Sequence, residues 1–212
     1  MKRMTSFVFS IFLMLSLAGC FSGKLTHSNP LPTQRTQTSF ISPQNKDIVW
    51  KKMIYGIGDS FFVINNLDKE SGFINVSYSG DPCMFVDCGR IYSKVIRAAA
   101  REEIYDFPAC KEYQSYKWVN KRGDYGITER SMELNGRANI VIQEVENGTH
   151  VKVKVMYIVH HRGRLYNAES KLFDTYDESI SFTSNSGDSF PDGPKCVANG
   201  KFEKRILDIL KD

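Results

Sequence analysis

Residues 132–159, MELNGRANIVIQEVENGTHVKVKVMYIV, carry the clearest structural pattern of the chain. Apolar and polar residues alternate on both sides of Asn147-Gly148, and alternation with period two is typical of a half-buried β-strand. Asn-Gly between two such runs indicates a two-residue hairpin turn of type I′. The apolar positions are Met132, Leu134, Ala138, Ile140 and Ile142 before the turn, and Val151, Val153, Val155, Tyr157 and Val159 after it.

This turn also predicts which residues of the two strands face each other. A two-residue turn at Asn147-Gly148 places Glu146 opposite Thr149, and the rest of the register follows. The facing residues are then apolar and share one side of the hairpin: Ile142 with Val153, Ile140 with Val155, and Ala138 with Tyr157. We therefore expect a long antiparallel hairpin with one buried face.

The stretch before the hairpin predicts a helix and a shorter hairpin. Ser42-Pro43 has the chemistry of a helix start, an N-cap followed by proline at the first helical position. Gly56 and Gly58 mark the helix end. Residues 61–66 and 73–78 alternate like strands, and the turn-forming residues 68–72 connect them.

The stretch after the hairpin predicts mostly loop and a final helix. Residues 160–177 are mainly polar and indicate a connection, 179–183 a strand, and 184–194 a loop with two glycines and two prolines. From about residue 198 to 210, apolar residues recur at helical spacing and form a stripe that could pack on a sheet. These elements predict an α+β fold, with an antiparallel sheet packed on a C-terminal helix.

Residues 83–130 give the weakest signals. Residues 91–103 are predicted to be helical because Ala98-Ala99-Ala100 favours a helix. Tyr116 with Trp118, and Tyr125 with Ile127, alternate like short strands.

The N-terminus has the features of a secretory signal. Lys2 and Arg3 precede an apolar run over residues 7–17, which is shorter than the roughly 20 residues of a membrane span. Leu17-Ala18-Gly19-Cys20 then resembles the lipobox of bacterial lipoproteins. In that family the cysteine thiol receives a diacylglyceryl group, a peptidase cuts before the cysteine, and the new amine is acylated. The alternative is an ordinary signal peptide whose cleavage site happens to lie near a cysteine.

The lipobox resemblance implies a domain organisation and a location. Residues 1–19 would be the signal peptide and Cys20 the lipidated N-terminus. Phe21, rather than Asp, follows the cysteine, as in the outer-membrane class, so we expect a periplasm-facing outer-membrane anchor. Residues 20–41 are rich in Ser, Thr, Gln and Asn and predict a flexible tether, which leaves 42–212 as a single domain.

A second resemblance concerns the opening of the domain. A helix followed by a strand, a turn and a second strand resembles the start of the helix-grip modules of BamC-type outer-membrane assembly lipoproteins. The residues that carry the resemblance are Trp50, Phe62-Val63-Ile64, Asp68, Gly72, Ile74, Val76 and Tyr78. It implies a helix-grip-like fold.

Charge and composition exclude several functions. The net charge of +4 falls to +2 when Lys2 and Arg3 are lost, which argues against a nucleic-acid partner, because such proteins carry a basic stripe. The sequence contains no catalytic, phosphate-binding or dinucleotide-binding motif, so no enzyme activity, cofactor or metal is predicted.

Three polar groups could carry chemistry, but we favour a simpler interpretation of each. His160-His161 is interpreted as a solvated strand end, because adjacent strand residues point to opposite faces. Asp174, Asp177 and Glu178 lack the spacing of a calcium loop and are expected in a solvated loop. The basic and aromatic residues of 97–122 could meet anionic headgroups or peptidoglycan, but ordinary surface is favoured.

Four cysteines remain if Cys20 is lipidated, and an even number in a secreted chain fits two disulfides. Four cysteines allow three connectivities. We favour Cys88–Cys196, which would clamp the start of the last helix to the sheet, together with Cys83–Cys110. Cys83–Cys88 with Cys110–Cys196 stays possible, as does a zinc site made of all four thiolates. Similar lipoproteins pair a cysteine after the first hairpin with one before the last helix, which adds weight to the first pairing.

The sequence thus leads to a main hypothesis and an alternative. The first is a lipid-anchored envelope protein that binds another envelope protein without catalysis, in outer-membrane assembly or maintenance; the assembly role rests on analogy alone. The alternative is a carrier of a small apolar ligand in a cavity between sheet and helix.

Overall fold

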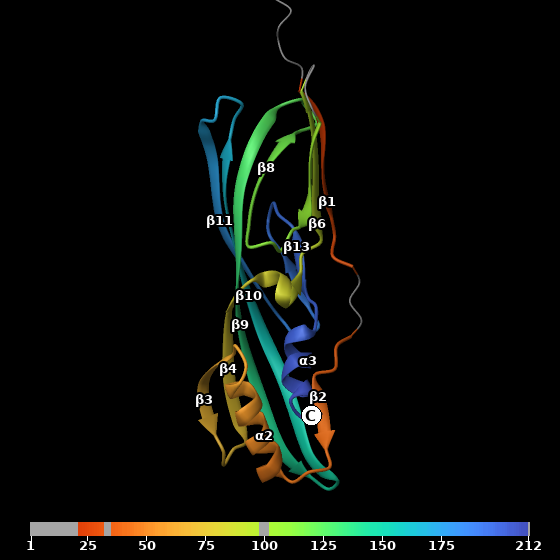
Figure 1. The fold of residues 1–212 in the computed structure, drawn as a ribbon, viewed down its shortest axis with the longest axis vertical. Coiled ribbons are helices and arrows are strands. Elements are labelled where there is room, and N and C mark those ends of the chain that lie inside the picture. The colour runs from red at the N-terminus through yellow and green to blue at the C-terminus, as the bar shows by residue number, and fades with distance from the viewer. Residues whose placement is uncertain (1–20, 32–34, 98–101, 212) are drawn as a thin grey trace, which may run out of the picture.

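The fold is dominated by antiparallel β-sheet in the computed structural model, which describes residues 21–31, 35–97 and 102–211. Strands make up 59% and helices 13% of the described residues, so the predicted α+β, helix-grip-like fold is wrong. Figure 1 shows an elongated molecule with two long strands along its long axis. Among the described residues, no helix combines the length and the hydropathy of a membrane span.

The two long strands are the predicted hairpin. β9 (Tyr125–Val145) and β10 (Gly148–Tyr166) pair antiparallel over their whole length. Even-numbered residues of β9 up to Ile142 and odd-numbered residues of β10 from Thr149 to Gly163 are buried, which confirms the predicted buried face. Both strands extend further than the sequence pattern indicated, because polar residues continue the alternation beyond its apolar part.

The register of this hairpin differs from the prediction by two residues. Ile142 faces Val151, because the turn consists of residues 146–147 and Gly148 already begins β10. Neither turn residue has a positive φ, which type I′ requires at both positions, so the predicted turn type is wrong. A shift of two residues leaves every side chain on its predicted face, because the side-chain period is two.

One half of the molecule, which we call the helical half, surrounds the turn end of this hairpin. α2 follows the N-cap Asn45, whose side chain accepts a hydrogen bond from the amide of Ile48, so the helix starts three residues later than predicted at Ser42-Pro43. β4 pairs with β9 and β3 with β4, while β2 pairs with β10. The elements are β2 (Ser39–Ser42), α2 (Lys46–Gly58), β3 (Val63–Asp68), β4 (Phe73–Gly80) and α3 (Lys201–Asp208).

Aromatic side chains close the core between α3 and the sheet. The ring of Phe202 lies 4.7 Å, centroid to centroid, from both Phe62 and Phe85. Gly136 on β9 makes room for it, since a Cβ there would lie 2.6 Å from the Phe202 ring. α3 therefore lies against the sheet, and it is shorter than the predicted helix over 198–210.

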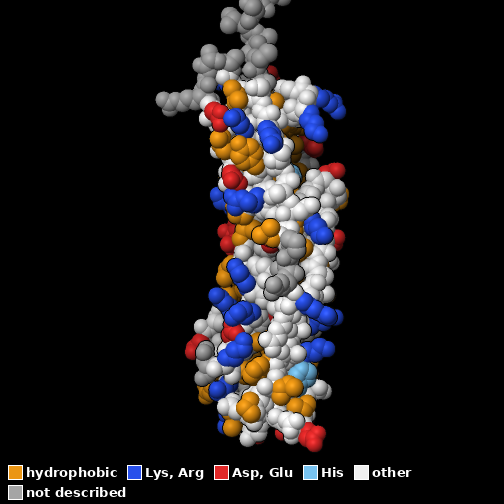
Figure 2. All heavy atoms as spheres, turned by 90° about the vertical axis from the view of Figure 1, so that its right-hand side faces the viewer, with side chains coloured by type: hydrophobic (Ala, Val, Ile, Leu, Met, Phe, Trp, Pro, Cys, Tyr) orange, Lys and Arg blue, Asp and Glu red, His pale blue; other side chains and the backbone are white. Residues whose placement is uncertain are grey.

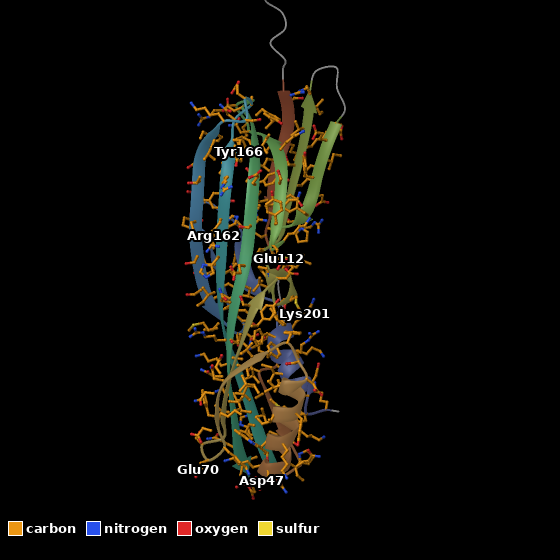
Figure 3. The ribbon with its side chains drawn as sticks, turned by 60° about the vertical axis from the view of Figure 1, so that its left-hand side comes forward. Asp47, Glu70, Glu112, Arg162, Tyr166 and Lys201 are labelled. Atoms are coloured by element: carbon orange, nitrogen blue, oxygen red, sulfur yellow. A yellow bond between two sulfur atoms is a disulfide. The ribbon has the colours of Figure 1, made fainter. Side chains whose placement is uncertain are left out.

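The other half, which we call the strand half, consists of two facing sheets. β1, β6 and β7 form one sheet, and β8 and β11 extend the β9–β10 sheet opposite it. Figure 3 shows Arg162 and Tyr166 in this half, while Asp47 and Glu70 lie at the far end of the helical half. The elements are β1 (Phe21–Ser28), β6 (Arg90–Arg97), β7 (Glu102–Pro108), β8 (Tyr113–Val119) and β11 (Leu172–Thr183).

Three further predictions are wrong. The expected flexible tether over 20–41 contains two strands, because residues 21–28 pair with β6 and residues 39–42 with β10. Residues 91–97 and 102–103 of the expected helix belong to two strands, β6 and β7, and Ile91, Ser93 and Val95 are buried in alternation. The alanines that favoured a helix lie outside the described residues. Residues 160–166 and 172–177 of the expected connection belong to β10 and β11.

The two halves meet at a small junction. It comprises η1 (Pro82–Met84), β5 (Val86–Asp87), β12 (Gly187–Ser189) and β13 (Lys195–Ala198), with β13 paired to both β12 and β5. Both disulfides lie in or beside this junction.

Candidate functional site

The structure pairs the four cysteines as the favoured connectivity predicted. Cys83 is bonded to Cys110 and Cys88 to Cys196. The zinc alternative is therefore wrong, because disulfide sulfurs cannot act as thiolate ligands. Cys20 and the rest of the predicted lipobox lie outside the described residues.

His160 and His161 point to opposite faces of β10, as expected, but His161 is not solvated. His161 is an odd-numbered residue of β10 and therefore lies on the buried face of the strand, and its side chain is only 6% exposed. The interpretation of this pair as a solvated strand end is therefore wrong for His161.

His161 belongs to a buried polar cluster between the two sheets of the strand half. Arg130 on β9 donates from Nε to His161 Nε2 at 3.2 Å and from Nη2 to the carbonyl of Ala109 at 2.6 Å. The hydroxyl of Tyr176 on β11 lies 3.0 Å from the same His161 Nε2. A Cβ on Gly163 would lie 2.2 Å from the Tyr176 ring, so the missing side chain lets the tyrosine lie across β10.

These contacts fix the protonation of His161. The Nε–H of Arg130 can only donate, so His161 Nε2 must be an acceptor and the proton of the neutral ring sits on Nδ1. Burial, and then the positive charges of Arg130 and His27, lower the pKa of His161 to about 3, which keeps the ring neutral. Burial also raises the pKa of Tyr176 to about 12, so its hydroxyl keeps its proton.

Two donor groups of the cluster have no partner among the described residues. Arg130 is 1% exposed, and neither its Nη1 nor His161 Nδ1 makes a hydrogen bond within that part of the chain. No carboxylate of the described residues forms an ion pair with Arg130. Burial lowers the pKa of Arg130, while Tyr176 and then Tyr116 oppose this. A guanidinium stays charged at neutral pH, so the cluster holds a buried cation that pairs with no carboxylate of the described residues.

A cavity of about 260 Å³ lies against this cluster. The loop that carries Gly193 covers His161 on the Nδ1 side, since a Cβ on Gly193 would stand 3.6 Å from Nδ1. Three carboxylates border the cavity together with the cluster: Asp174, Glu178 and Asp192. His27, which lies on β1 in the region predicted to be a tether, borders it from the other sheet, and burial and Arg130 lower the pKa of His27.

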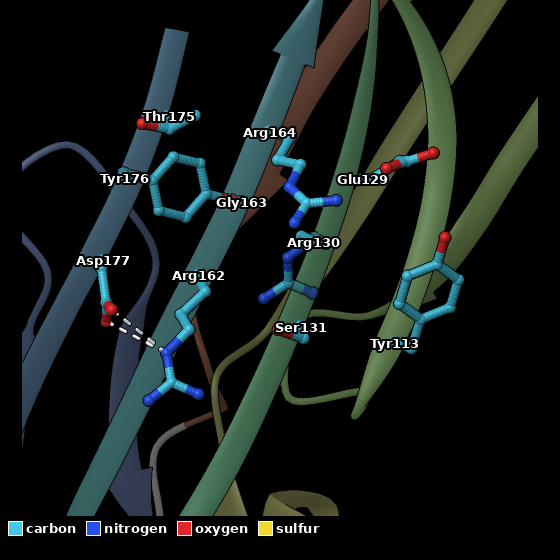
Figure 4. A pocket seen from close by; sticks show the side chains of 10 residues that line it. All are labelled: Tyr113, Glu129, Arg130, Ser131, Arg162, Gly163, Arg164, Thr175, Tyr176 and Asp177. Atoms are coloured by element: carbon cyan, nitrogen blue, oxygen red, sulfur yellow. Dashed lines mark hydrogen bonds and ion pairs between the residues drawn. The ribbon is translucent and has the colours of Figure 1, made fainter.

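An exposed groove, drawn in Figure 4, adjoins the cluster. Arg130, Gly163 and Tyr176 line it together with residues of the outer face of the same strands. Arg162 pairs there with Asp177 at 3.2 Å. The predicted acidic cluster is therefore divided by the sheet: Asp177 points to the outer face, whereas Asp174 and Glu178 border the inner cavity. All three lie on β11 rather than in a loop.

The basic and aromatic residues of 97–122 do not form one patch. Lys117 pairs with Glu103, and Tyr116 is buried against the cluster; Arg101 lies outside the described residues. Figure 2 shows lysine and arginine side chains spread along one face, with hydrophobic and acidic ones between them.

A second concave surface lies on the outer side of α2. Ile48 and Tyr55 stand two turns apart on this helix and are 44% and 76% exposed. Ile209, just after α3, completes an apolar floor, and Lys51 and Lys52 lie at its edge. We call this surface the α2 groove; its volume is about 510 Å³.

Sequence reasoning missed Arg130, Tyr176 and His27. A signal existed for Arg130, because counting back by two from Met132 reaches it on the buried face of β9. A charged residue at a position that should be buried marks a candidate site. Comparison with known proteins adds no further guide: no family model, no curated protein and no solved structure matches this chain significantly.

Proposed function

We propose that this chain is a lipid-anchored envelope protein that works by binding another envelope protein rather than by catalysis. The α2 groove is the observation that carries the proposal. It is apolar at its floor, exposed and open on the outer side of a helix, which is the form of a surface that receives a partner segment.

Anchoring at Cys20 is the second part of the proposal. It rests on the lipobox resemblance of residues 17–20, on the preceding signal sequence and on the two disulfides, which fit an oxidising compartment such as the periplasm. A lipid at Cys20 would hold the domain at the outer membrane, on the side of the periplasm.

The packing of the core gives less support to the carrier alternative. Five side chains would line a ligand cavity between sheet and helix, and each is at most 1% exposed within one core cluster: Ile140, Ile142, Val153, Val155 and Phe202. The Phe202 ring contacts described above fill the space that an apolar ligand would need.

Site-specific crosslinking in living cells tests partner binding. A photoreactive residue at Tyr55 should give one discrete protein adduct, and Ile48→Glu should weaken it by placing a charge on the apolar floor. The matched control is the same probe at Lys154, which is exposed on the outer face of β10. Absence of a discrete adduct at Tyr55, or an equal adduct at Lys154, would contradict the proposal.

Processing tests the anchor. Cys20→Ala should accumulate as a precursor that keeps residues 1–19 and gains no lipid. If this variant matured to the same size as the wild type and still required detergent to leave the membrane, Cys20 would not be the anchor.

A further inference from the structure

β1 brings the chain next to Cys20 into the sheet at the end of the strand half. Phe21, the first residue of β1, pairs with Arg97 at the end of β6. Cys20 is bonded directly to Phe21. One peptide bond, rather than a flexible spacer, therefore connects the domain to the proposed lipid anchor.

Two turns of the strand half lie at the same end as Phe21. A Cβ on Gly23 would lie 3.0 Å from the Cβ of Val119, which ends β8, so the turn over 120–124 follows at this end. β10 ends at Tyr166, opposite the start of β9, and the turn over 167–171 leads from there into β11. Figure 1 shows both turns at the end where β1 starts. We call Phe21, Arg97 and residues 120–124 and 167–173 the strand tip.

We propose that the strand tip is a membrane-contact surface that lies against anionic lipid headgroups. The inference rests on the proposed anchoring at Cys20. The acyl chains must reach the hydrocarbon core, and the headgroup layer outside that core is only roughly 5–8 Å thick. One residue of extended chain spans at most ~3.3–3.6 Å. A domain that begins one residue after the anchor must therefore place this end in the headgroup layer or directly on it.

The charges of the strand tip suit an anionic surface. Lys121, Arg122 and Lys171 are exposed, and none of them forms an ion pair with another described residue. Basic side chains within a Debye length of anionic lipid are attracted to it. Over the whole strand tip, four basic residues stand against two acidic ones: Arg97, Lys121, Arg122 and Lys171 against Asp124 and Glu169.

Apolar side chains are exposed at the same place. Leu172 and Phe173 begin β11 and are 47% and 55% exposed. Large apolar side chains next to basic ones are typical of surfaces that enter the boundary between headgroups and acyl chains. Insertion of Leu172 and Phe173 would remove their exposed area from water and hold the strand tip against the membrane.

This contact sets the direction in which the helical half points. Figure 3 shows Tyr166 towards one end of the molecule and Asp47 of α2 at the other. β9 has 21 residues and runs between these ends. At ~3.3 Å for each residue, the α2 groove would stand on the order of 60 Å from the membrane. A partner within the periplasm could then reach the groove without approaching the bilayer.

Quenching of a tryptophan by spin-labelled lipid tests this orientation. The lipidated full chain, with Trp50→Phe and Trp118→Phe to remove its own two reporters, is reconstituted into vesicles of phosphatidylcholine and phosphatidylglycerol. The vesicles contain a lipid with a nitroxide on its headgroup. Phe173→Trp should lose most of its fluorescence, because headgroups surround this position. Tyr55→Trp, in the α2 groove, is the matched control and should keep its fluorescence.

Sedimentation with the vesicles separates failure of the contact from failure of the anchor. If the chain sediments but tryptophan at position 173 keeps its fluorescence, or loses no more than tryptophan at position 55, the membrane contact is overturned and the anchor stands. If mass spectrometry finds no lipid on Cys20 and the chain stays in solution, both are overturned.

Charge substitutions test the part of the headgroups. Lys121→Gln with Arg122→Gln should reduce the quenching at position 173 when phosphatidylglycerol is present, and should change nothing in vesicles of phosphatidylcholine alone. Lys152→Gln with Lys154→Gln is the matched control, because both lysines are exposed on β10 in the helical half. Unchanged quenching in the first pair of substitutions, or an equal change in the second, would contradict a contact with anionic lipid.

Discussion

Gly148 is required for its backbone conformation and for its lack of a side chain. Its φ is +130°, and a Cβ there would lie 2.1 Å from the carbonyl oxygen of Ser42. Gly148→Val should therefore lower the free energy of unfolding by at least the ~1–3 kcal/mol typical of local backbone strain. Thermal melts measure the loss. Gly123→Val is the matched control, because Gly123 also has a positive φ, but a Cβ there would have no atom within 4 Å. Equal losses in the two variants would show that contact with Ser42 does not matter.

His161 makes the stability of the chain depend on pH. Its pKa falls from 6.5 to about 3 on folding, through burial and then through Arg130 and His27. Between these values the unfolded chain binds more protons than the folded one, so stability decreases as the pH falls from 6.5 towards 3. The slope from this one group reaches about 1.4 kcal/mol per pH unit. The lowered pKa of His27 acts in the same direction.

Urea denaturation between pH 7 and pH 4 measures this dependence. His161→Gln removes the titrating ring and should flatten the slope, although it also lowers stability at every pH. The neighbouring His160→Gln is the matched control. If the slopes of wild type and His161→Gln were the same, proton binding at His161 would not govern acid stability.

Among the secondary-structure elements, prediction succeeded where the alternation of apolar residues and the turn-forming residues indicated the same element. The β9–β10 hairpin was predicted because five apolar residues on each strand alternate with polar ones, and the wrong turn changed only the register. The site was missed because Arg130 and His161 are polar, and a polar residue was taken as the end of a strand. β1 was not predicted for a related reason. Its pairing with β6 is made by the backbone, and its few apolar residues give no strand pattern in the sequence.

The two disulfides differ in the length of chain that they close. Cys88 and Cys196 are 108 residues apart, and Cys83 and Cys110 are 27 apart. In the chain-entropy account these loops correspond to about 4.8 and about 3.6 kcal/mol of stabilisation. Replacing Cys88 and Cys196 by alanine should therefore lower the denaturation midpoint more than replacing Cys83 and Cys110. Peptide mapping without reduction checks the connectivity, and a peptide that joins Cys110 to Cys196 would contradict it.

The whole molecule is organised by two strands that both halves share. β4 and β2 pair with β9 and β10 near the hairpin turn, whereas β8 and β11 pair with them further along. Each half therefore buries one part of the same two strands. Loss of either half would leave the continuation of β9 and β10 without a covering layer, so the two halves depend on one scaffold.

This sharing predicts that both halves unfold together. The chain offers one tryptophan in each half: Trp50 is buried on α2, and Trp118 on β8 donates to Thr128 Oγ1 at 2.9 Å. The variants Trp118→Phe and Trp50→Phe leave one fluorescent reporter each. With the disulfides intact, the fluorescence transition of each variant should have the same midpoint as the circular-dichroism transition of that variant. A tryptophan transition separated from the circular-dichroism transition of its own variant would show that the halves unfold independently, despite the strands that run through both.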